Sequence, residues 1–285
     1  MRQAVALLTC HNRRDKTIAC LAALFDCVKP ADLSVDVMLV DDASDDGTGK
    51  AVQSRFPQVK VLLGDGNLYW AGGMRRVFGE ALKLDYDFYL FLNDDTILDS
   101  YAVDTLVRTY DELQVVWPKV GMVVGTTYDP ETRKATYGGL RRASWWRPLR
   151  LDLVVPGPLP IPCDSMNTNC VLVSRAAAQE IGNFDDAFTH RIADIDYGLR
   201  ARRAGYCNWV VPGFVGACRN DHNFEGAWVN PATPVRERFR QVLQVKGLPI
   251  WEWMIFTRRH GGPFWPAHWL WPYCKIIFTS AFRRG

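Results

Sequence analysis

Two adjacent carboxylates end an apolar run in the stretch YLFLNDDTILD, residues 89–99. Asn93, Asp94 and Asp95 directly follow four apolar residues, where an unpaired buried charge would cost several kcal/mol. Mg²⁺ and Mn²⁺ prefer carboxylate and other oxygen ligands, and they share their coordination sphere with substrate phosphates. The stretch predicts that Asp95, helped by Asp94 or Asn93, holds a divalent metal bound to a nucleotide diphosphate.

Two further acidic clusters are candidates for a chemical role. Asp41 and Asp42 end the apolar run 35–42 in VDDASDDGT, and Asp194 and Asp196 stand in ADIDYGLRARRAG. A displacement in which a hydroxyl group attacks needs a carboxylate within hydrogen-bond reach to take the proton of that hydroxyl. Asp194 is our candidate for that base.

Each cluster also has a plain structural interpretation. The acids of NDDT are good helix N-caps, DDASDDGT is typical of a solvated turn, and acids in a first helical turn suit the helix dipole. The segment GGMRR is a weak phosphate-loop signal, because no G-x-G-x-x-G pattern is present. The functional interpretation depends on NDDT, DDASDDGT and GGMRR each following a predicted strand, in order, with a fourth, acidic cluster downstream.

The elements that must position these residues alternate along the first hundred residues. Apolar runs predict strands at 4–10, 35–42, 59–64 and 87–95, and helical spacing predicts helices at 15–28, 48–56 and 71–84. This pattern predicts an α/β fold with a doubly wound, mostly parallel or mixed sheet. Ligands of such sheets bind at the carboxyl ends of the strands, where the acids lie.

The pattern changes after residue 100. We expect a strand at 120–128, an irregular loop region at 136–170, a strand running into a helix at 170–182, and a short helix at 194–205. We expect Arg200, Arg202 and Arg203 to form a solvated helix face. We place a catalytic domain at 1–235, with a nucleotide half at about 1–100 and an acceptor half at about 101–235.

Composition excludes several classes of protein. The net charge of +3 is too small to indicate nucleic-acid binding, and the eight cysteines form no CxxC pair that would indicate a zinc or redox site. The first residues are typical of a strand rather than a signal peptide, and no run of about 18 uncharged apolar residues predicts a membrane span. We expect a protein of the reducing cytosol.

The last fifty residues, 236–285, differ from the rest, and we expect them to form an aromatic and basic helical extension. Residues 236–285 carry nine Lys and Arg against two Asp and Glu, together with Trp251, Trp253, Trp265, Trp269 and Trp271. Aromatic and cationic residues together favour a membrane–water interface. A helical pair that packs on the catalytic domain or on another subunit is the alternative. Two alternatives therefore remain for residues 251–285: contact with the inner face of the cytoplasmic membrane, or packing on protein.

The order of these motifs resembles that of a family 2 glycosyltransferase of the GT-A fold over about residues 3–225. The segments that carry the resemblance are TCHNR, VDDASDDGT, GNLYWAGGMRR, FLNDDT, MNTNCVLVSR, FDDAF and ADIDYGLRARRAGY. GNLYWAGGM with LNDDT is most similar to the rhamnosyltransferase-like branch. That branch implies an inverting hexosyltransferase that uses a nucleotide-diphosphate sugar, such as dTDP-rhamnose or a UDP-sugar, and a glycan or lipid-linked acceptor in bacterial surface polysaccharide synthesis.

The resemblance also implies roles for single residues. Asp95 and His222 match metal ligands for Mn²⁺ or Mg²⁺, and Asp194 matches the base. The chain departs from the family pattern at Asn93, which replaces the first acid of D-x-D, and at Ala193, which replaces the first acid of E-D-x-D. Residues that match the nucleotide-sugar site are Thr9, His11, Asn12, Arg13, Asp41, Asp42, Ser44, Gly66, Asn67, Arg75, Asn93 and Asp94.

Two other function classes fit parts of the pattern. A nucleotidyltransferase also uses metal-binding acids on an α/β sheet, but the loop TCHNRRDKT after the first strand lacks the expected glycine. A non-catalytic carbohydrate-binding protein would use exposed tryptophans, yet it has no need of Asp41, Asp95 and Asp194 together.

Overall fold

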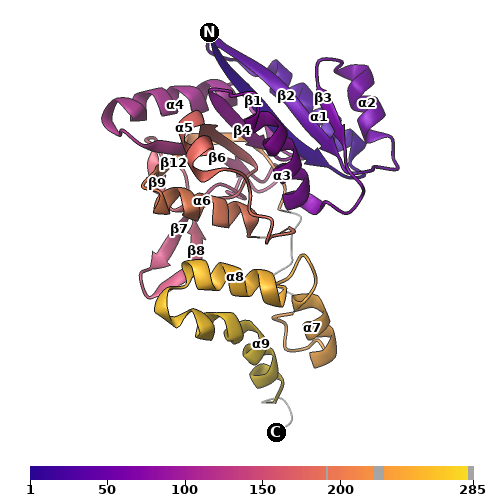
Figure 1. The fold of residues 1–285 in the computed structure, drawn as a ribbon, viewed down its shortest axis with the longest axis vertical. Helices are drawn as coiled ribbons and strands as arrows, with labels where there is room; N and C mark the ends of the chain where they lie inside the picture. The colour runs from indigo at the N-terminus through magenta and orange to yellow at the C-terminus, as the bar shows by residue number, and fades with distance from the viewer. Residues whose placement is uncertain (191, 221–227, 282–285) are drawn as a thin grey trace.

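The computed structural model describes residues 1–190, 192–220 and 228–281 (Figure 1). Its first part alternates strands and helices as the sequence predicts. The elements are β1 (Arg2–Cys10), α1 (Arg14–Asp26), β2 (Leu33–Asp41), α2 (Thr48–Arg55), β3 (Lys60–Leu63), α3 (Tyr69–Leu82) and β4 (Phe88–Leu92).

One nine-stranded sheet organises the molecule in the order β3-β2-β1-β4-β11-β6-β12-β5, with β9 paired to β12. The strands β3, β2, β1 and β4 are parallel neighbours. The strand β11 (Cys170–Ser174) runs antiparallel between β4 and β6 (Val120–Tyr128), and β12 (Cys207–Ala217) pairs parallel with β6. The doubly wound mixed sheet of a GT-A fold is thereby confirmed. The remaining strands of this sheet are β5 (Ile97–Leu98) and β9 (Ile161–Cys163).

The sheet is covered by apolar layers on both faces. One layer packs α1 and α4 (Ala102–Val116) against the sheet, and the other packs α3, α5 (Arg175–Ile181) and α6 (Ala193–Arg203). Every residue of β4 and of β6 is buried. Burial on both faces explains why these strands are continuous apolar runs in the sequence.

The expectation of an irregular loop at 136–170 was wrong. This region contains β7 (Gly139–Ser144), β8 (Arg147–Leu153), β9 and β10 (Ser165–Met166), and the order β10-β7-β8 forms a second, three-stranded sheet. The signal was the alternation of partly buried Leu149, Leu151 and Leu153 with exposed Arg150 and Asp152, which has the period of two expected of a strand. Neighbouring prolines and glycines obscured it.

The C-terminal extension is helical, as predicted, and lies at the end of the molecule away from β1–β3 (Figure 1). Buried Arg238 joins the first helix of the extension to the last, because its Nη1 donates to the Ile276 carbonyl at 3.3 Å and its Nη2 donates to Thr279 Oγ1 at 2.9 Å. Among the described residues, no helix has the length and apolar character needed to cross a membrane. The helices are α7 (Val235–Val242), α8 (Ile250–His260), η2 (Gly262–Phe264) and α9 (Trp265–Ala281).

Candidate active site

The strand ends β1, β2 and β4 meet at one edge of the sheet. The pairing of Cys10 with Asp41 and of Leu7 with Phe91 aligns the carboxyl ends of these three parallel strands. The segments that follow them carry the three predicted polar motifs. We call these three segments, 9–13, 41–46 and 93–95, together with the segment 64–68 that follows β3, the donor edge.

Arg13 is the partner of the two adjacent carboxylates that follow β4. Its Nη1 donates to Asp94 Oδ1 at 2.9 Å, and its Nη2 donates to Asp95 Oδ2 at 2.7 Å. Asp94 is 4% exposed, and burial raises its pKa to about 7 against the opposing effect of Arg13. Thr17 Oγ1 donates to the second oxygen of Asp94 at 3.5 Å. The pair is therefore a charge cluster held by α1 rather than a helix cap.

Asp41 and Asp42 shape the loops of the donor edge. Both side chains are buried rather than part of a solvated turn. Asp41 accepts from the backbone N–H groups of Ser44 at 3.1 Å and Gly49 at 3.0 Å. Asp42 accepts from the N–H groups of Gly66 at 2.8 Å and Leu68 at 3.0 Å. Their carboxylates fix the two loops that follow β2 and β3.

Hydrogen bonds join the segment after β1 to the segment after β2. His11 Nδ1 lies 2.6 Å from the Asp42 carbonyl oxygen, and the Asn12 N–H donates to Ser44 Oγ at 2.9 Å. Asn12 has a φ of 53°, in the left-handed region that Asn tolerates better than most residues. The structure thus brings these predicted residues together at an exposed rim.

Three other predicted residues take distinct places. Thr9 is buried against α3, where a Cβ on Gly73 would lie 2.1 Å from Thr9 Oγ1, so the glycine is required by close packing. Asn67 is exposed in the loop before α3. Arg75 is directed away from the loop, because its Nη1 lies 3.4 Å from the carbonyl oxygens of both Asp185 and Phe188.

The residues after β4 that the sequence assigned to the metal and nucleotide already contact protein groups. In the part of the chain that the structure describes, no group of three His, Cys, Asp or Glu side chains is arranged to hold an ion. Asn93 Oδ1 already accepts from Trp70 Nε1 at 3.0 Å, and Asp94 is buried. Asp95 is the more exposed carboxylate, and its Oδ1 lies 3.6 Å from Cys218 Sγ. His222 lies outside the described residues.

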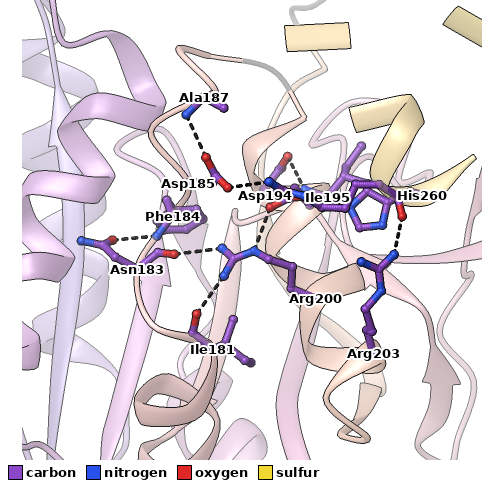
Figure 2. A network of polar contacts seen from close by, with 12 residues as sticks. Ile181, Asn183, Phe184, Asp185, Ala187, Asp194, Ile195, Arg200, Arg203 and His260 are labelled. Atoms are coloured by element: carbon purple, nitrogen blue, oxygen red, sulfur yellow. Dashed lines mark hydrogen bonds and ion pairs between the residues drawn. The ribbon is translucent and has the colours of Figure 1, made fainter. Parts of the chain in front are cut away.

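The candidate base lies on a different set of elements. Asp194 is in the first turn of α6, and its Oδ1 accepts from the Ile195 N–H at 2.8 Å. Figure 2 shows it between Asp185, on the preceding segment, and His260, on α8. We call residues 183–190 and 192–196 the base segment.

The helix face after Asp194 is not simply solvated. Arg200 Nε donates to the buried carboxylate of Asp196 at 2.8 Å, and its Nη1 and Nη2 donate to the carbonyls of Ile181 and Asn183, each at 2.8 Å. Arg203 donates to the Arg259 carbonyl on α8. The expectation of a solvated face is wrong for Arg200, because Asp196 and two carbonyls enclose its guanidinium group (Figure 2).

Trp70 joins the donor edge to the base segment, a role that its apolar side chain did not reveal in the sequence. Its Nε1 donates to Asn93 at 3.0 Å, and its ring packs edge-on against Phe184 with centroids 5.6 Å apart. The Ala71 N–H donates to the Thr189 carbonyl at 3.2 Å, which adds a second link. The start of α3 therefore connects the two regions.

Comparison with known proteins identifies the family of the chain. The family model described as "Glycosyl transferase family 2" matches residues 6–181, which include the donor edge. The chain belongs to glycosyl transferase family 2. Membership of this family favours sugar transfer over the nucleotidyltransferase and the non-catalytic binding protein as a description of its function.

Curated relatives of this family 2 glycosyltransferase include the N-acetylglucosaminyl-diphospho-decaprenol L-rhamnosyltransferases of two Mycobacterium tuberculosis strains, CDC 1551 and H37Rv. Identity is 24% over 203 residues, which is 62% of this chain and 64% of the relatives. The match thus spans less than two thirds of their length. Among solved structures, the mannosyltransferase PcManGT from Pyrobaculum calidifontis, in complex with GDP-Man and Mn²⁺, has a TM-score of 0.56 and 15% identity, over 97% of this chain and 73% of that one. This likeness supports the GT-A fold.

Proposed function

We propose that this enzyme is an inverting transferase that moves a hexose from a nucleotide-diphosphate sugar to a hydroxyl of a lipid-linked or glycan acceptor. The observation that carries the proposal is that Trp70 contacts both regions. Its indole N–H donates to Asn93 of the donor edge, and its ring packs against Phe184 of the base segment. A donor bound at the strand ends and a base at the start of α6 therefore belong to one site.

The donor edge supplies the groups that a nucleotide diphosphate requires. We assign to the nucleoside the ends of β1 and β2 and the two segments that follow them, with the loop before α3 beside them. The residues are Thr9, His11, Asn12, Asp41, Asp42 and Ser44 at the two strand ends, and Gly66 and Asn67 in the loop. A divalent ion on Asp95, when bound with the diphosphate, supplies charge neutralisation for the leaving group. Arg13 is a cation at the same place, and its five donors suit phosphate oxygens as well as carboxylates.

The base segment supplies the other half of the reaction. Asp194 accepts the proton of the acceptor hydroxyl while the oxygen bonds to the anomeric carbon and the diphosphate leaves with the electron pair of the broken bond. The N-terminal end of α6 carries positive partial charge, which helps to orient the Asp194 carboxylate. One displacement with one base inverts the anomeric configuration.

The relatives support a choice of substrates. The mycobacterial proteins are named for L-rhamnose transfer to a decaprenol-linked acceptor. We therefore propose dTDP-rhamnose, with a UDP-sugar as the alternative donor, and a polyprenyl-diphosphate-linked saccharide made for a bacterial surface polysaccharide.

A lipid-linked acceptor gives the C-terminal extension a purpose. Side chains of Trp251, Phe264, Trp271, Ile277 and Phe278 are exposed on α8, η2 and α9, whereas Trp253 is stacked on Phe256. Exposed aromatic side chains beside lysines and arginines suit the interface of an anionic membrane, where each basic residue contributes roughly 1 kcal/mol. We propose that this surface rests peripherally on the inner face of the cytoplasmic membrane.

The direct experiment incubates the enzyme with radiolabelled dTDP-rhamnose or UDP-sugars, with lipid-linked acceptors extracted from bacterial membranes, and with Mn²⁺, Mg²⁺ or EDTA. We expect label in the organic phase with one donor, and more of it with a divalent ion. A protein that binds none of these donors and labels no acceptor would contradict the proposal. Vesicles of phosphatidylglycerol should sediment the enzyme, and Trp271→Glu should weaken that binding while leaving transfer to a water-soluble acceptor analogue unchanged.

A further inference from the structure

A buried carboxylate lies two residues after the candidate base. Asp196 is fully buried and accepts three hydrogen bonds, from Arg200 Nε at 2.8 Å, Arg259 Nη1 at 2.7 Å and His260 Nε2 at 2.8 Å. Arg200 belongs to the same helix, but the other two donors come from α8 in the C-terminal extension. A buried charge needs such partners, because removing one of them leaves an uncompensated charge.

The same arginine holds the other end of the base segment. Arg259 Nη2 donates to Asp185 Oδ2 at 2.8 Å, so its guanidinium bridges two carboxylates that lie on either side of Asp194 in the chain. Planar geometry with several fixed donors makes arginine, and not lysine, suited to such a bridge. The bridge fixes the distance between the two ends of the base segment.

Further contacts between α8 and the base segment reinforce the bridge. The Thr189 N–H donates to Glu252 Oε2 at 3.3 Å, and Phe256 packs edge-on against Phe188 with ring centroids 6.4 Å apart. Figure 2 shows His260 facing the start of α6. Helix α8 thus contacts the base segment before and after Asp194.

The backbone directly before the base is strained. Ile192 has a φ of 62°, in the left-handed region that β-branched residues avoid. Such a conformation costs on the order of 1–3 kcal/mol and persists only where surrounding contacts impose it. The contacts from α8 to Asp185 and Asp196 are placed on both sides of Ile192.

We propose that α8 is a positioning element of the active site, in which Arg259, aided by His260, holds the base segment so that Asp194 faces the acceptor hydroxyl. This inference rests on the proposed role of Asp194. The extension then has a task in the chemical step that does not depend on any contact with a membrane, and Arg259 is a positioning residue that acts through Asp185 and Asp196.

The test compares two substitutions of neighbouring arginines on α8. Arg259→Gln removes the bridge, whereas Arg258→Gln removes the same charge from an exposed side chain and serves as the control. Hydrogen exchange of peptides covering 183–190 and 192–199 reports on the base segment without any need for activity. Loss of charge-assisted hydrogen bonds should speed exchange there by about 10- to 100-fold in Arg259→Gln and leave it unchanged in Arg258→Gln.

Kinetics then show whether the bridge matters for transfer. Misplacement of a catalytic group by about 1 Å can cost about 100-fold, so we expect kcat to fall about 10- to 100-fold in Arg259→Gln while the donor dissociation constant stays near that of the wild type. Arg259→Lys is the milder variant and should recover part of kcat, because lysine reaches one carboxylate at a time. Thermal unfolding confirms that each variant is folded.

The outcomes separate the two proposals. Unchanged exchange in Arg259→Gln would overturn the positioning role whatever the activity, and so would faster exchange with an unchanged kcat. Full transfer by Asp194→Asn, together with faster exchange in Arg259→Gln, would instead show that the bridge exists and that the assignment of the base is wrong.

Discussion

The donor edge and the base segment are built in different ways. In the donor edge, the carboxylates are held by backbone N–H groups of the loops that follow them and by Arg13 from the first loop, all within the first hundred residues, and Cys218 is the one distant contact named for Asp95. The base segment is held by α3 on one side and by α8 on the other, and α8 follows Asp194 by more than fifty residues. The donor edge is held mainly by its own loops, whereas the base segment depends on contacts from the extension.

This difference has a consequence for function. A donor site built from its own loops retains its shape when the extension is perturbed, whereas the base segment loses contacts at both ends. Changes in the donor edge should therefore act on nucleotide affinity, and changes around the base segment should act on the rate of transfer.

The largest effect is expected from the base itself. Positioned proton transfer contributes about 100- to 10,000-fold to a rate, so Asp194→Asn should lower kcat by a factor in that range and leave the donor dissociation constant unchanged. Asp186→Asn, which changes an exposed carboxylate of the same segment, is the matched control. Equal transfer rates for the two variants, measured with saturating donor, would remove Asp194 from the mechanism.

The next effect separates the donor edge from the base. Coupled ligands change each other's affinity by about 5- to 150-fold, and we expect Mn²⁺ to strengthen nucleotide-diphosphate binding within that range. Asp95→Asn should abolish this gain, because it removes the more exposed carboxylate of the pair. Calorimetric titration with and without Mn²⁺ measures the gain, and Asp152→Asn, at an exposed position of β8 outside the donor edge, provides the control. A gain that survives in Asp95→Asn would place the metal elsewhere.

A third prediction concerns the packing that joins the two regions. Gly73→Ala places a Cβ 2.1 Å from Thr9 Oγ1, so α3 must shift away from β1. Such overpacking costs about 1–3 kcal/mol of unfolding free energy, more than the gain in helix propensity. In Gly72→Ala the nearest atom is Leu68 Cβ at 3.3 Å, and the loss should be smaller. Urea unfolding of both variants tests this, and equal stabilities would contradict the packing argument.

The smallest effect is a dependence on pH at the base segment. Burial lowers the pKa of His260, which donates to Asp196 and also faces Arg203 and Arg259, while His260, Arg200 and Arg259 lower the pKa of Asp196 although its burial acts against them. A lowered histidine pKa means that the unfolded chain binds more protons, so stability is lost as pH falls below about 6.5. One titrating group gives at most about 1.4 kcal/mol per pH unit.

Thermal unfolding between pH 7.5 and pH 5.5 checks the sign. The wild type should lose more stability on acidification than His260→Gln, which retains an N–H donor toward Asp196 but does not titrate. A wild type that becomes more stable than the variant at the lower pH would show that the imidazole is held as a cation.

The donor edge was the more predictable region because its signals are local. Apolar runs that end in Asp41, Asp42, Asp94 and Asp95 predicted both the strands and the edge at which these acids meet, and the structure confirms that arrangement. Even there, the sequence did not reveal that Arg13 donates to both Asp94 and Asp95. These residues are about eighty positions apart, and the pairing of β1 with β4 brings them together.

The base segment was predictable only in part. The acids at the start of α6 and its basic end indicated a short helix, and that helix is present. Nothing in the local pattern distinguished Arg200, which is enclosed, from an exposed arginine. Nor did it predict that Arg259, on a helix of the extension, contacts Asp185 and Asp196. Such contacts arise from tertiary packing between distant segments, for which the sequence has no local periodicity.

The central claim is that a single base on α6 assists one displacement at a donor bound on the strand ends. The anomeric configuration of the product tests it most directly, by proton nuclear magnetic resonance of the purified glycoside released from the acceptor. The account predicts a configuration opposite to that of the sugar in the donor. Retention of the donor configuration would contradict it, because retention requires either two displacements or attack from the face that the diphosphate leaves.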